Sequence, residues 1–302
     1  MSESEISAPK EGNETFKGIT INYATWGQFS RPERAVLLIH GVTSNCQAWG
    51  ITSNSQARKG LGPFLAKQGW FVIAPDLRGR GKSSKPPHGY GIPYHANDLL
   101  SLCDALDLPT VHVVGHSLGA QIAIFLAAIH PQRVGRIVLV DAGGKLPPDA
   151  IQAIAPALAR LGTVYPSLEA FLQTMQQAPT YQWNTFWERH YRYDAEVHAD
   201  GTVTSRVPKA AIAEEIAVNA FATRLDTLSE RIHAPTLIVR AALGLLGPDR
   251  GFILPAEEAE RLRNVIAGSR VTVIPEANHY TILLSDIFNR DVAAFLAAEG
   301  AG

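Results

Sequence analysis

Short runs of apolar residues rich in Val, Ile and Leu recur along the chain, and most of them are continuous rather than alternating. Continuous apolar runs of this length are typical of strands that are buried on both faces of a parallel sheet. The expected strands are GITINYATW (18–26), AVLLIHG (35–41), FVIAPD (71–76), VHVVGHS (111–117), RIVLVDAG (136–143), TLIVRA (236–241) and VTVIPEA (271–277).

Segments with helical character separate these runs, and each ends at or shortly before Gly or Pro. The expected helices cover residues 57–69, 93–107, 120–131 and 255–268. Strands that alternate with helices in this way predict an α/β protein with a doubly wound, mainly parallel sheet.

The alternation stops between about Gly143 and Phe221, where the sequence changes to helix formers and aromatic residues. An insertion that follows the carboxyl end of a strand lies over the crevice in which open α/β sheets bind ligands, so this segment is a candidate lid. The predicted organisation is a flexible N-terminal tail (1–14), an α/β core (15–142 and 222–302) and a helical cap (143–221).

Charge and composition narrow the classes of partner. The 27 Lys and Arg residues against 28 Asp and Glu give a formal net charge of −1, which does not attract nucleic acid or an anionic membrane. Cys46 and Cys103 have neither disulfide-framework nor metal-ligand spacing, so no metal is expected. The N-terminus lacks the features of a signal peptide, and no uncharged apolar run of about 18 residues occurs. We expect a cytoplasmic protein with a small-molecule partner and no membrane insertion, and homo-oligomer formation stays open.

Ser117 is a candidate nucleophile because of the pattern around it. In GHSLG it lies between Gly115 and Gly119, where VHVV gives way to a long apolar helical segment. In a sharp strand-to-helix turn, glycines at these positions avoid clashes, and the turn presents the serine hydroxyl above the sheet. The alternative is that Ser117 only caps the helix. The flanking strand and helix favour the nucleophile.

A serine hydroxyl needs a base, and His279 is the candidate. It follows the last expected strand and precedes the final helix, which puts it at the same carboxyl edge of the sheet as Ser117. Acyl transfer also needs donors for the oxyanion. His40-Gly41 ends a strand and allows the backbone amide of Val42 to point at the site.

The second oxyanion donor would be the amide of Leu118, directly after the nucleophile. Candidates for contact with the substrate are residues next to these loops and aromatic residues of the cap, although packing in the core is an alternative explanation for each aromatic side chain. These candidates are Trp49, His116, Trp183 and Trp187.

LLIHGVTSN (37–45), APDLRGRGKSS (74–84), GHSLG (115–119) and ANHY (277–280) occur in an order that resembles the α/β-hydrolase superfamily over nearly the whole chain. The resemblance implies an eight-stranded, mostly parallel sheet with a helical cap, no cofactor, and a triad of Ser, acid and His. HGVTSN also resembles members of the acetamidomethylene-succinate hydrolase type. Fold resemblance alone does not identify the substrate.

The sequence departs from the usual family pattern at the triad acid. In most relatives the acid follows the strand that corresponds to TLIVRA, but Gly244 stands at that point here and Asp249 comes later. Asp141 ends the strand RIVLVDAG, and some members of the superfamily take their acid from this strand end. We favour Asp141, with Asp249 as the alternative acid.

Ser117, His279 and two amide donors are suited to forming and hydrolysing an acyl-enzyme. Haloalkane dehalogenases and epoxide hydrolases of this superfamily carry an aspartate at the position of Ser117, which argues against both activities. A carboxylic ester is the simplest substrate, so we expect a carboxylesterase. Amides, lactones and C–C bonds are chemically adjacent. A cofactor-free perhydrolase or haloperoxidase, and a non-catalytic receptor on the same fold, are the alternatives from other classes.

Overall fold

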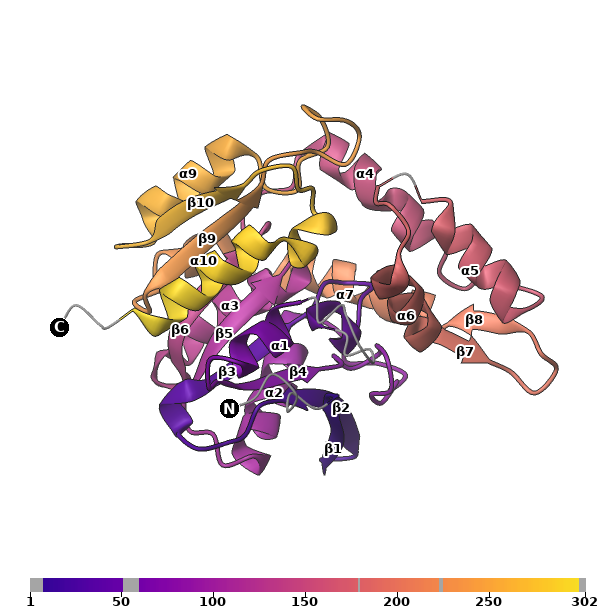
Figure 1. The fold of residues 1–302 in the computed structure, drawn as a ribbon, viewed down its shortest axis with the longest axis horizontal. Helices are drawn as coiled ribbons and strands as arrows, with labels where there is room; N and C mark the ends of the chain where they lie inside the picture. The colour runs from indigo at the N-terminus through magenta and orange to yellow at the C-terminus, as the bar shows by residue number, and fades with distance from the viewer. Residues whose placement is uncertain (1–7, 51–59, 179, 223–224, 299–302) are drawn as a thin grey trace.

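Eight strands pair into one sheet in the order β1-β2-β4-β3-β5-β6-β9-β10 (Figure 1). The computed structural model describes residues 8–50, 60–178, 180–222 and 225–298. From β4 to β10 all neighbours pair in parallel, whereas β2 pairs antiparallel with both β1 and β4. The α/β class with a mostly parallel eight-stranded sheet is therefore confirmed. The strands are β1 (Lys10–Phe16), β2 (Ile19–Trp26), β3 (Ala35–Ile39), β4 (Phe71–Pro75), β5 (Val111–His116), β6 (Val134–Val140), β9 (Thr236–Ala241) and β10 (Arg270–Ile274).

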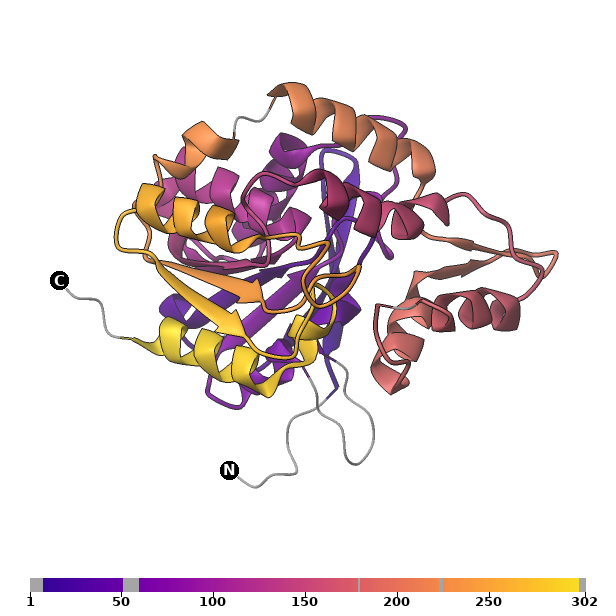
Figure 2. The ribbon, with the colours of Figure 1, turned by 90° about the horizontal axis from the view of Figure 1, so that it is seen from above.

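Helices cover both faces of this sheet (Figure 2). One face carries α1 (Leu61–Ala66) and α10 (Asp286–Ala297), and the other carries α2 (Ile92–Ala105), α3 (Leu118–Ile129), α8 (Leu225–Ser229) and α9 (Ala256–Val265). Short 3-10 turns occur at Pro32–Arg34, Cys46–Trp49, Pro131–Arg133 and Thr281–Leu284. Of the expected helix 57–69, residues 57–59 lie outside the described part.

The buried strands are apolar throughout because each contributes to two core layers. In β3, Leu37 and Ile39 pack in the layer beneath α2 and α3, whereas Val36 and Leu38 pack in the layer beneath α1 and α10. Successive side chains of a strand point to opposite faces, so burial of both faces removes the alternation. This is the physical origin of the continuous apolar runs in the sequence.

The carboxyl ends of β3 and β5 enclose the crevice of the sheet. The chain passes from β3 to β4 on one side of β3 and returns to β5 on its other side. Open α/β sheets bind ligands at such a reversal of strand order. The loop after β3 and the turn after β5 therefore meet at the position where this topology favours a binding site.

The segment between β6 and α8 leaves the core and forms the cap (Figure 1). Its elements are α4 (Pro148–Ala159), α5 (Leu168–Gln176), α6 (Thr185–Asp194), β7 (Ala195–Val197), β8 (Val203–Ser205) and α7 (Lys209–Ala222). The cap is not purely helical as expected, because β7 and β8 form an antiparallel hairpin. Strands of three residues are too short to produce a recognisable alternation in the sequence.

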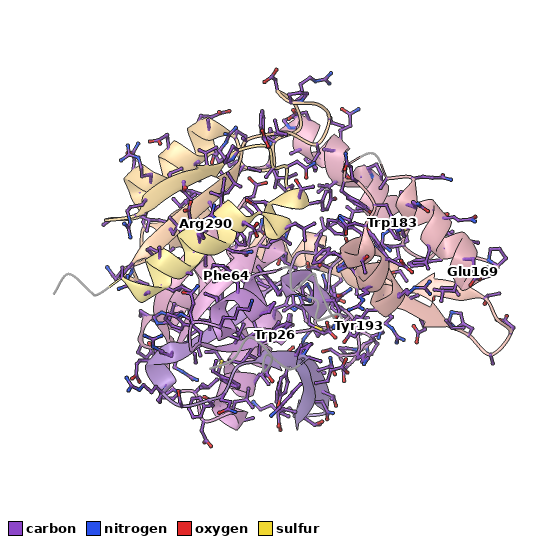
Figure 3. The ribbon with its side chains drawn as sticks, in the orientation of Figure 1. Trp26, Phe64, Glu169, Trp183, Tyr193 and Arg290 are labelled. Carbon is purple, nitrogen blue, oxygen red and sulfur yellow. The ribbon has the colours of Figure 1, made fainter. Side chains whose placement is uncertain are left out.

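Tyr193 and Glu214 are among the side chains that anchor the cap to the core. Tyr193 belongs to α6, where the cap meets the core (Figure 3). Its hydroxyl donates to Asp76 Oδ2 at 2.6 Å and accepts from Asn22 Nδ2 at 2.9 Å. From α7, the carboxylate of Glu214 accepts from the amide of Gly89 at 2.8 Å and from the amide of Tyr90 at 3.1 Å. The cap is therefore tied to the core on two sides.

The expected flexible tail over residues 1–14 is wrong in its second half. Lys10–Phe16 forms β1, the edge strand that pairs with β2. None of its side chains is buried, so the strand is held by backbone pairing and gives no hydrophobic signal. Residues 1–7 lie outside the described part of the chain.

Candidate active site

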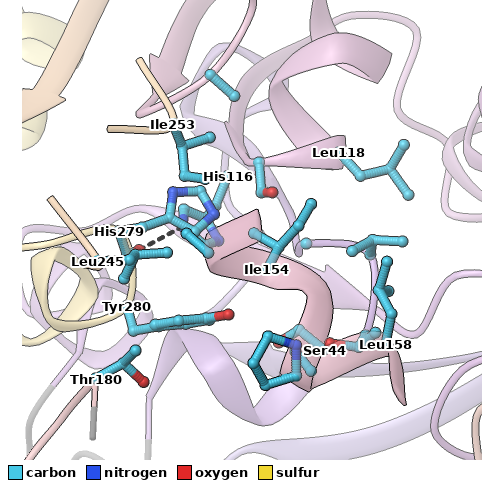
Figure 4. Close-up of a pocket in the computed structure, with 18 of the residues that line it drawn as sticks. Ser44, His116, Leu118, Ile154, Leu158, Thr180, Leu245, Ile253, His279 and Tyr280 are labelled. Carbon is cyan, nitrogen blue, oxygen red and sulfur yellow. Dashed lines mark hydrogen bonds between the residues drawn. The ribbon is translucent and has the colours of Figure 1, made fainter. Parts of the chain in front are cut away.

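A cavity of about 600 Å³ lies between the carboxyl edge of the sheet and the cap (Figure 4). Its size is in the range of small-molecule sites. The core loops contribute Val42, Ser117, Leu118 and His279 to its lining, together with His116. Most of the nominated site residues therefore border one space.

Ser117 occupies a strained turn between β5 and α3. Its φ is 57°, and its amide donates to the carbonyl of Val140 at 3.1 Å. A Cβ atom on Gly115 would lie 2.0 Å from the Gly119 carbonyl oxygen, and one on Gly119 would lie 2.0 Å from the Ile39 carbonyl oxygen. Backbone contact between strand, turn and helix thus requires both glycines. The Ser117 hydroxyl makes no capping bond to α3, so capping does not explain the serine.

The loop after β3 lies directly against the serine. A Cβ atom on Gly41 would be 3.6 Å from Ser117 Oγ. Leu77 N–H donates to His40 Nε2 at 3.1 Å, so the proton of the neutral ring is on Nδ1, which donates to the Gly41 carbonyl at 2.8 Å. Burial lowers the pKa of His40 to about 3, which keeps the ring neutral. In a planar trans peptide the Val42 N–H points opposite to the Gly41 carbonyl, so His40 sets the direction of that amide.

His279 and Asp141 form a buried pair. The Nδ1 atom of His279 lies 2.9 Å from Asp141 Oδ2, and the residues are 4% and 2% exposed. The other carboxylate oxygen, Oδ1, accepts from the amide of Ala241 at 2.9 Å. With Nδ1 engaged, Nε2 is the ring nitrogen of His279 that is left for a partner in the cavity.

The alternative acid, Asp249, is exposed in a turn between Gly247 and Arg250. The pair with His279 is made by Asp141. A Cβ atom on Gly244 would lie only 1.8 Å from the carbonyl oxygen of Arg250. The loop after β9 therefore has no room for a side chain at the point where most relatives carry the acid.

His116 contacts both the backbone and the ring of His279. Its Nε2 lies 2.8 Å from the carbonyl oxygen of His279, and the two rings are 4.5 Å apart between centroids (Figure 4). Burial and the neighbouring His279 hold the pKa of His116 well below its usual value. The neutral His116 ring therefore donates from Nε2 and fixes the backbone that carries His279.

Of the three tryptophans expected near the substrate, only Trp187 lines the cavity. Its ring stacks on that of Tyr181, with 4.2 Å between the ring centroids. Trp183 lies in the cap (Figure 3). It stacks on Tyr191 instead and is not part of the lining. Trp49 is 1% exposed and packs in the core beneath α1 and α10. The expectation is wrong for Trp183 and Trp49. In the case of Trp49, the 3-10 turn after the loop directs the ring inward.

Among the polar residues of the cavity lining that sequence reasoning missed are Arg160, His190 and Glu215. Arg160 pairs through Nη1 with Asp194 Oδ2 at 3.0 Å. His190 is 5% exposed, its Nδ1 has no hydrogen-bond partner among the described residues, and burial lowers its pKa to about 4. Glu215 is 1% exposed. Each belongs to the cap, in a segment whose charged residues look solvent-exposed in the sequence.

Among the residues that the structure describes, no group of three or more His, Cys, Asp or Glu side chains could hold a metal ion. No helix in the same part of the chain is both long and apolar enough to cross a membrane.

Comparison with known proteins places this site in a family. The model of the family described as alpha/beta hydrolase fold matches residues 34–286. This match covers well over half of the chain. The chain therefore belongs to the α/β-hydrolase family, and the resemblance of its sequence motifs is confirmed.

Individual relatives differ in how much of the chain they match. An uncharacterized protein of Mycobacterium bovis is 38% identical over 144 residues, which are 45% of this chain and only 39% of that protein. A non-heme haloperoxidase of Rhodococcus erythropolis is 26% identical over 302 residues, covering 92% of this chain and 96% of the relative. The crystal structure of E-2-(acetamidomethylene)succinate hydrolase has a TM-score of 0.78 at 22% identity and covers 96% of this chain and all of its own. The last likeness shows a common fold.

Proposed function

We propose that the protein is a serine hydrolase that cleaves carboxylic esters through an acyl-enzyme. The observation that carries this proposal is the buried His279–Asp141 pair beside a cavity that Ser117 also lines. In the proposed roles, Ser117 is the nucleophile, His279 the general base and Asp141 the acid that orients it.

The proposed reaction uses these residues in sequence. Ser117 Oγ attacks the acyl carbon while His279 Nε2 takes its proton, and Asp141 stabilises the imidazolium. The amides of Val42 and Leu118 donate to the oxyanion, and the amide of Leu118 belongs to the first residue of α3, where the helix dipole also favours negative charge. His279 then protonates the leaving alcohol. Water activated by the same histidine hydrolyses the acyl-enzyme and regenerates Ser117.

The apolar walls of the cavity favour a substrate ester with an apolar acyl or alcohol group. Ile154 and Leu158 of α4 face Leu245 and Ile253 of the loop after β9 across the space near His279 (Figure 4). Burial of apolar carbon against such walls contributes about 0.8 kcal/mol for each CH₂ group. Esters with medium-length chains should therefore bind better than acetate.

The test is a panel of p-nitrophenyl esters from acetate to laurate, measured with the wild type and S117A. The proposal expects turnover by the wild type with a preference above acetate, and a loss of about 10⁶ in kcat for S117A. S117A should keep the thermal unfolding temperature, because the hydroxyl makes no capping bond. Turnover by S117A at the wild-type rate would remove the serine from the mechanism.

A perhydrolase activity is the second candidate, and its support is the haloperoxidase relative that matches almost the whole chain. The same triad can form an acyl-enzyme from acetic acid with loss of water, and hydrogen peroxide in place of water then attacks the acyl carbon and releases peracetic acid and free Ser117. Halogenation that depends on both acetate and peroxide would favour this candidate. Ester hydrolysis without halogenation would favour the first.

Amides, lactones and C–C bonds pass through the same tetrahedral oxyanion. They become the leading substrates if the wild type hydrolyses no ester of the panel. A tight ligand with no turnover would instead indicate a receptor.

A further inference from the structure

A buried ionic cluster joins the cap to the core behind the cavity. Glu215 of α7 places Oε2 2.6 Å from Arg80 Nη2 and 2.8 Å from His95 Nε2. Glu215 is 1% exposed, and the other two residues are fully buried. Burial lowers the pKa of His95, so the ring is neutral and donates from Nε2. The carboxylate of Glu215 thus compensates the guanidinium of Arg80.

The same arginine holds the loop after β3. Its Nε donates to the carbonyl of Val42 at 2.9 Å, and its Nη1 donates to the carbonyl of Arg78 at 3.0 Å. Arg80 therefore makes one contact to the cap and one to the residue whose amide is the first oxyanion donor. A single planar guanidinium connects the two in a fixed geometry.

Val42 is held on both sides as a result. The peptide before it is fixed by the bond from His40 to the Gly41 carbonyl, and the peptide after it is fixed by Arg80. A turn bond from the Ser44 amide to the Gly41 carbonyl, at 3.1 Å, closes the loop. With both flanking peptide planes fixed, the direction of the Val42 N–H is set before a substrate arrives.

We infer that Glu215 is a positioning residue through which docking of the cap organises the oxyanion hole. This inference rests on the proposed hydrolase function. Without a carboxylate opposite it, the buried guanidinium of Arg80 loses its counter-charge and moves to find another partner. Its bond to the Val42 carbonyl then weakens, and the Val42 amide no longer points at the developing charge. Preorganised oxyanion donors stabilise the transition state more than the bound substrate. Misdirecting the Val42 amide should therefore lower kcat and leave KM nearly unchanged.

Direct contact between Glu215 and the substrate is the competing explanation, because Glu215 also lines the cavity. Arg80 does not line it, which makes R80K informative. A lysine keeps a positive charge opposite Glu215 but has one ammonium group and cannot also occupy the position of Nε beside Val42. The competing explanation predicts a change in KM for E215Q and none for R80K.

The matched control is E214Q. Glu214 precedes Glu215 in α7 and also ties the cap to the core, but its hydrogen-bond partners are the amides of Gly89 and Tyr90, and its other close neighbour is His88 Nδ1 at 3.7 Å. Both substitutions remove one cap–core carboxylate. Only Glu215 is connected to Val42.

The experiment measures kcat and KM of the preferred ester for the wild type, E215Q, R80K and E214Q, together with hydrogen exchange of a peptide covering residues 40–50. Removing one oxyanion donor costs about 10² to 10³ in kcat, so misdirecting it should cost about 10-fold to 100-fold in E215Q and R80K at nearly constant KM. Exchange of the peptide should rise in both variants. E214Q should change neither measurement.

Three results overturn the inference: a kcat of E215Q equal to that of E214Q, a rise in KM alone, or unchanged exchange in both E215Q and R80K. If E215Q does not fold, E215D, which keeps the charge on a shorter side chain, takes its place with the same criteria. If the wild type hydrolyses no ester, the proposed function fails, and hydrogen exchange alone decides whether the cap orders the loop.

Discussion

Asp141 Oδ2 lies 2.9 Å from His279 Nδ1, although the two residues follow β6 and β10, which are separated in the sheet by β9. Asp141 spans this gap because it turns across the end of β9. Its φ is 49°, its amide donates to the Val239 carbonyl at 2.7 Å, and its Oδ1 accepts from the Ala241 amide at 2.9 Å. The carboxylate is thus held by backbone on one side and by the histidine on the other.

The pair predicts a large difference between two asparagine substitutions. D141N should lower kcat by about 10³ to 10⁴, because the amide no longer fixes the tautomer of His279 or stabilises its charged form. D249N should leave kcat near the wild-type value, since Asp249 is exposed in a turn. Steady-state kinetics on the preferred ester would check this. Small and equal losses would mean that neither residue is the acid.

The crowded loop after β9 gives a second prediction. G244A should lower the free energy of unfolding by about 3 kcal/mol, because its Cβ would lie 1.8 Å from the Arg250 carbonyl oxygen and the loop would have to open. G268A is the control: Gly268 has a φ of +69°, and no atom of the described residues lies within 4 Å of a Cβ there, so it should cost only about 1 kcal/mol of backbone strain. Urea unfolding measures both.

The clash between a side chain at position 244 and the Arg250 carbonyl also limits where the triad acid can lie. Moving the carboxylate to the position used by most relatives, in D141N/G244D, should not restore the activity of D141N. A recovery of kcat would show that the loop tolerates a side chain and that its geometry does not decide where the acid lies.

The sequence could indicate much of the fold because the core strands are buried on both faces and leave continuous apolar runs. It could not indicate β1, whose side chains are never fully buried, nor the three-residue strands β7 and β8. These elements are defined by backbone pairing with a partner, and pairing leaves no mark in the pattern of hydrophobic residues.

The site was predictable where local geometry restricts the residue type. Close contact between backbones requires the two glycines around Ser117, so the motif GHSLG is enough to predict the turn. Arg80 and Glu215 are 135 residues apart, and each lies in a charged segment that resembles a solvated surface. Only the folded chain brings them together. The prediction that Trp49 contacts the substrate was wrong for a related reason, because the burial of this side chain depends on the direction of one 3-10 turn.

Removal of the Tyr193 hydroxyl should loosen the attachment of the cap. Y193F loses the bonds to Asp76 and Asn22, and the Asp76 carboxyl is fully buried, so water cannot replace the lost donor. The same burial raises the pKa of Asp76. We expect the free energy of unfolding to fall by about 1–3 kcal/mol. Y94F, at a residue that is 45% exposed, should change it by less than about 0.5 kcal/mol. Equal stabilities in urea would show that Tyr193 does not anchor the cap.

Buried histidines should make the protein lose stability on mild acidification. In the folded chain, burial lowers the pKa of His40 to about 3 and that of His190 to about 4, from an ordinary value of 6.5. At a pH between the folded and the ordinary pKa of each histidine, the unfolded chain binds more protons than the folded chain. The free energy of unfolding therefore decreases as the pH falls below 6.5. From about pH 7 to about pH 5, each histidine should remove about 2 kcal/mol.

Replacement of one buried histidine isolates its share of this loss. H190Q cannot take up the proton in either state, so the decrease in unfolding free energy between about pH 7 and about pH 5 should be smaller by about 2 kcal/mol than in the wild type. H233Q, at an exposed residue, should leave the decrease unchanged. Glu215 contributes little in this pH range. Burial raises its pKa but Arg80 and His95 lower it by more, to about 2 from an ordinary value of 4.5, so its stabilising effect is lost only as the pH falls below 4.5. If H190Q and H233Q show the same slope as the wild type, His190 is already charged in the folded protein, and water must reach the cavity far more freely than its buried position indicates.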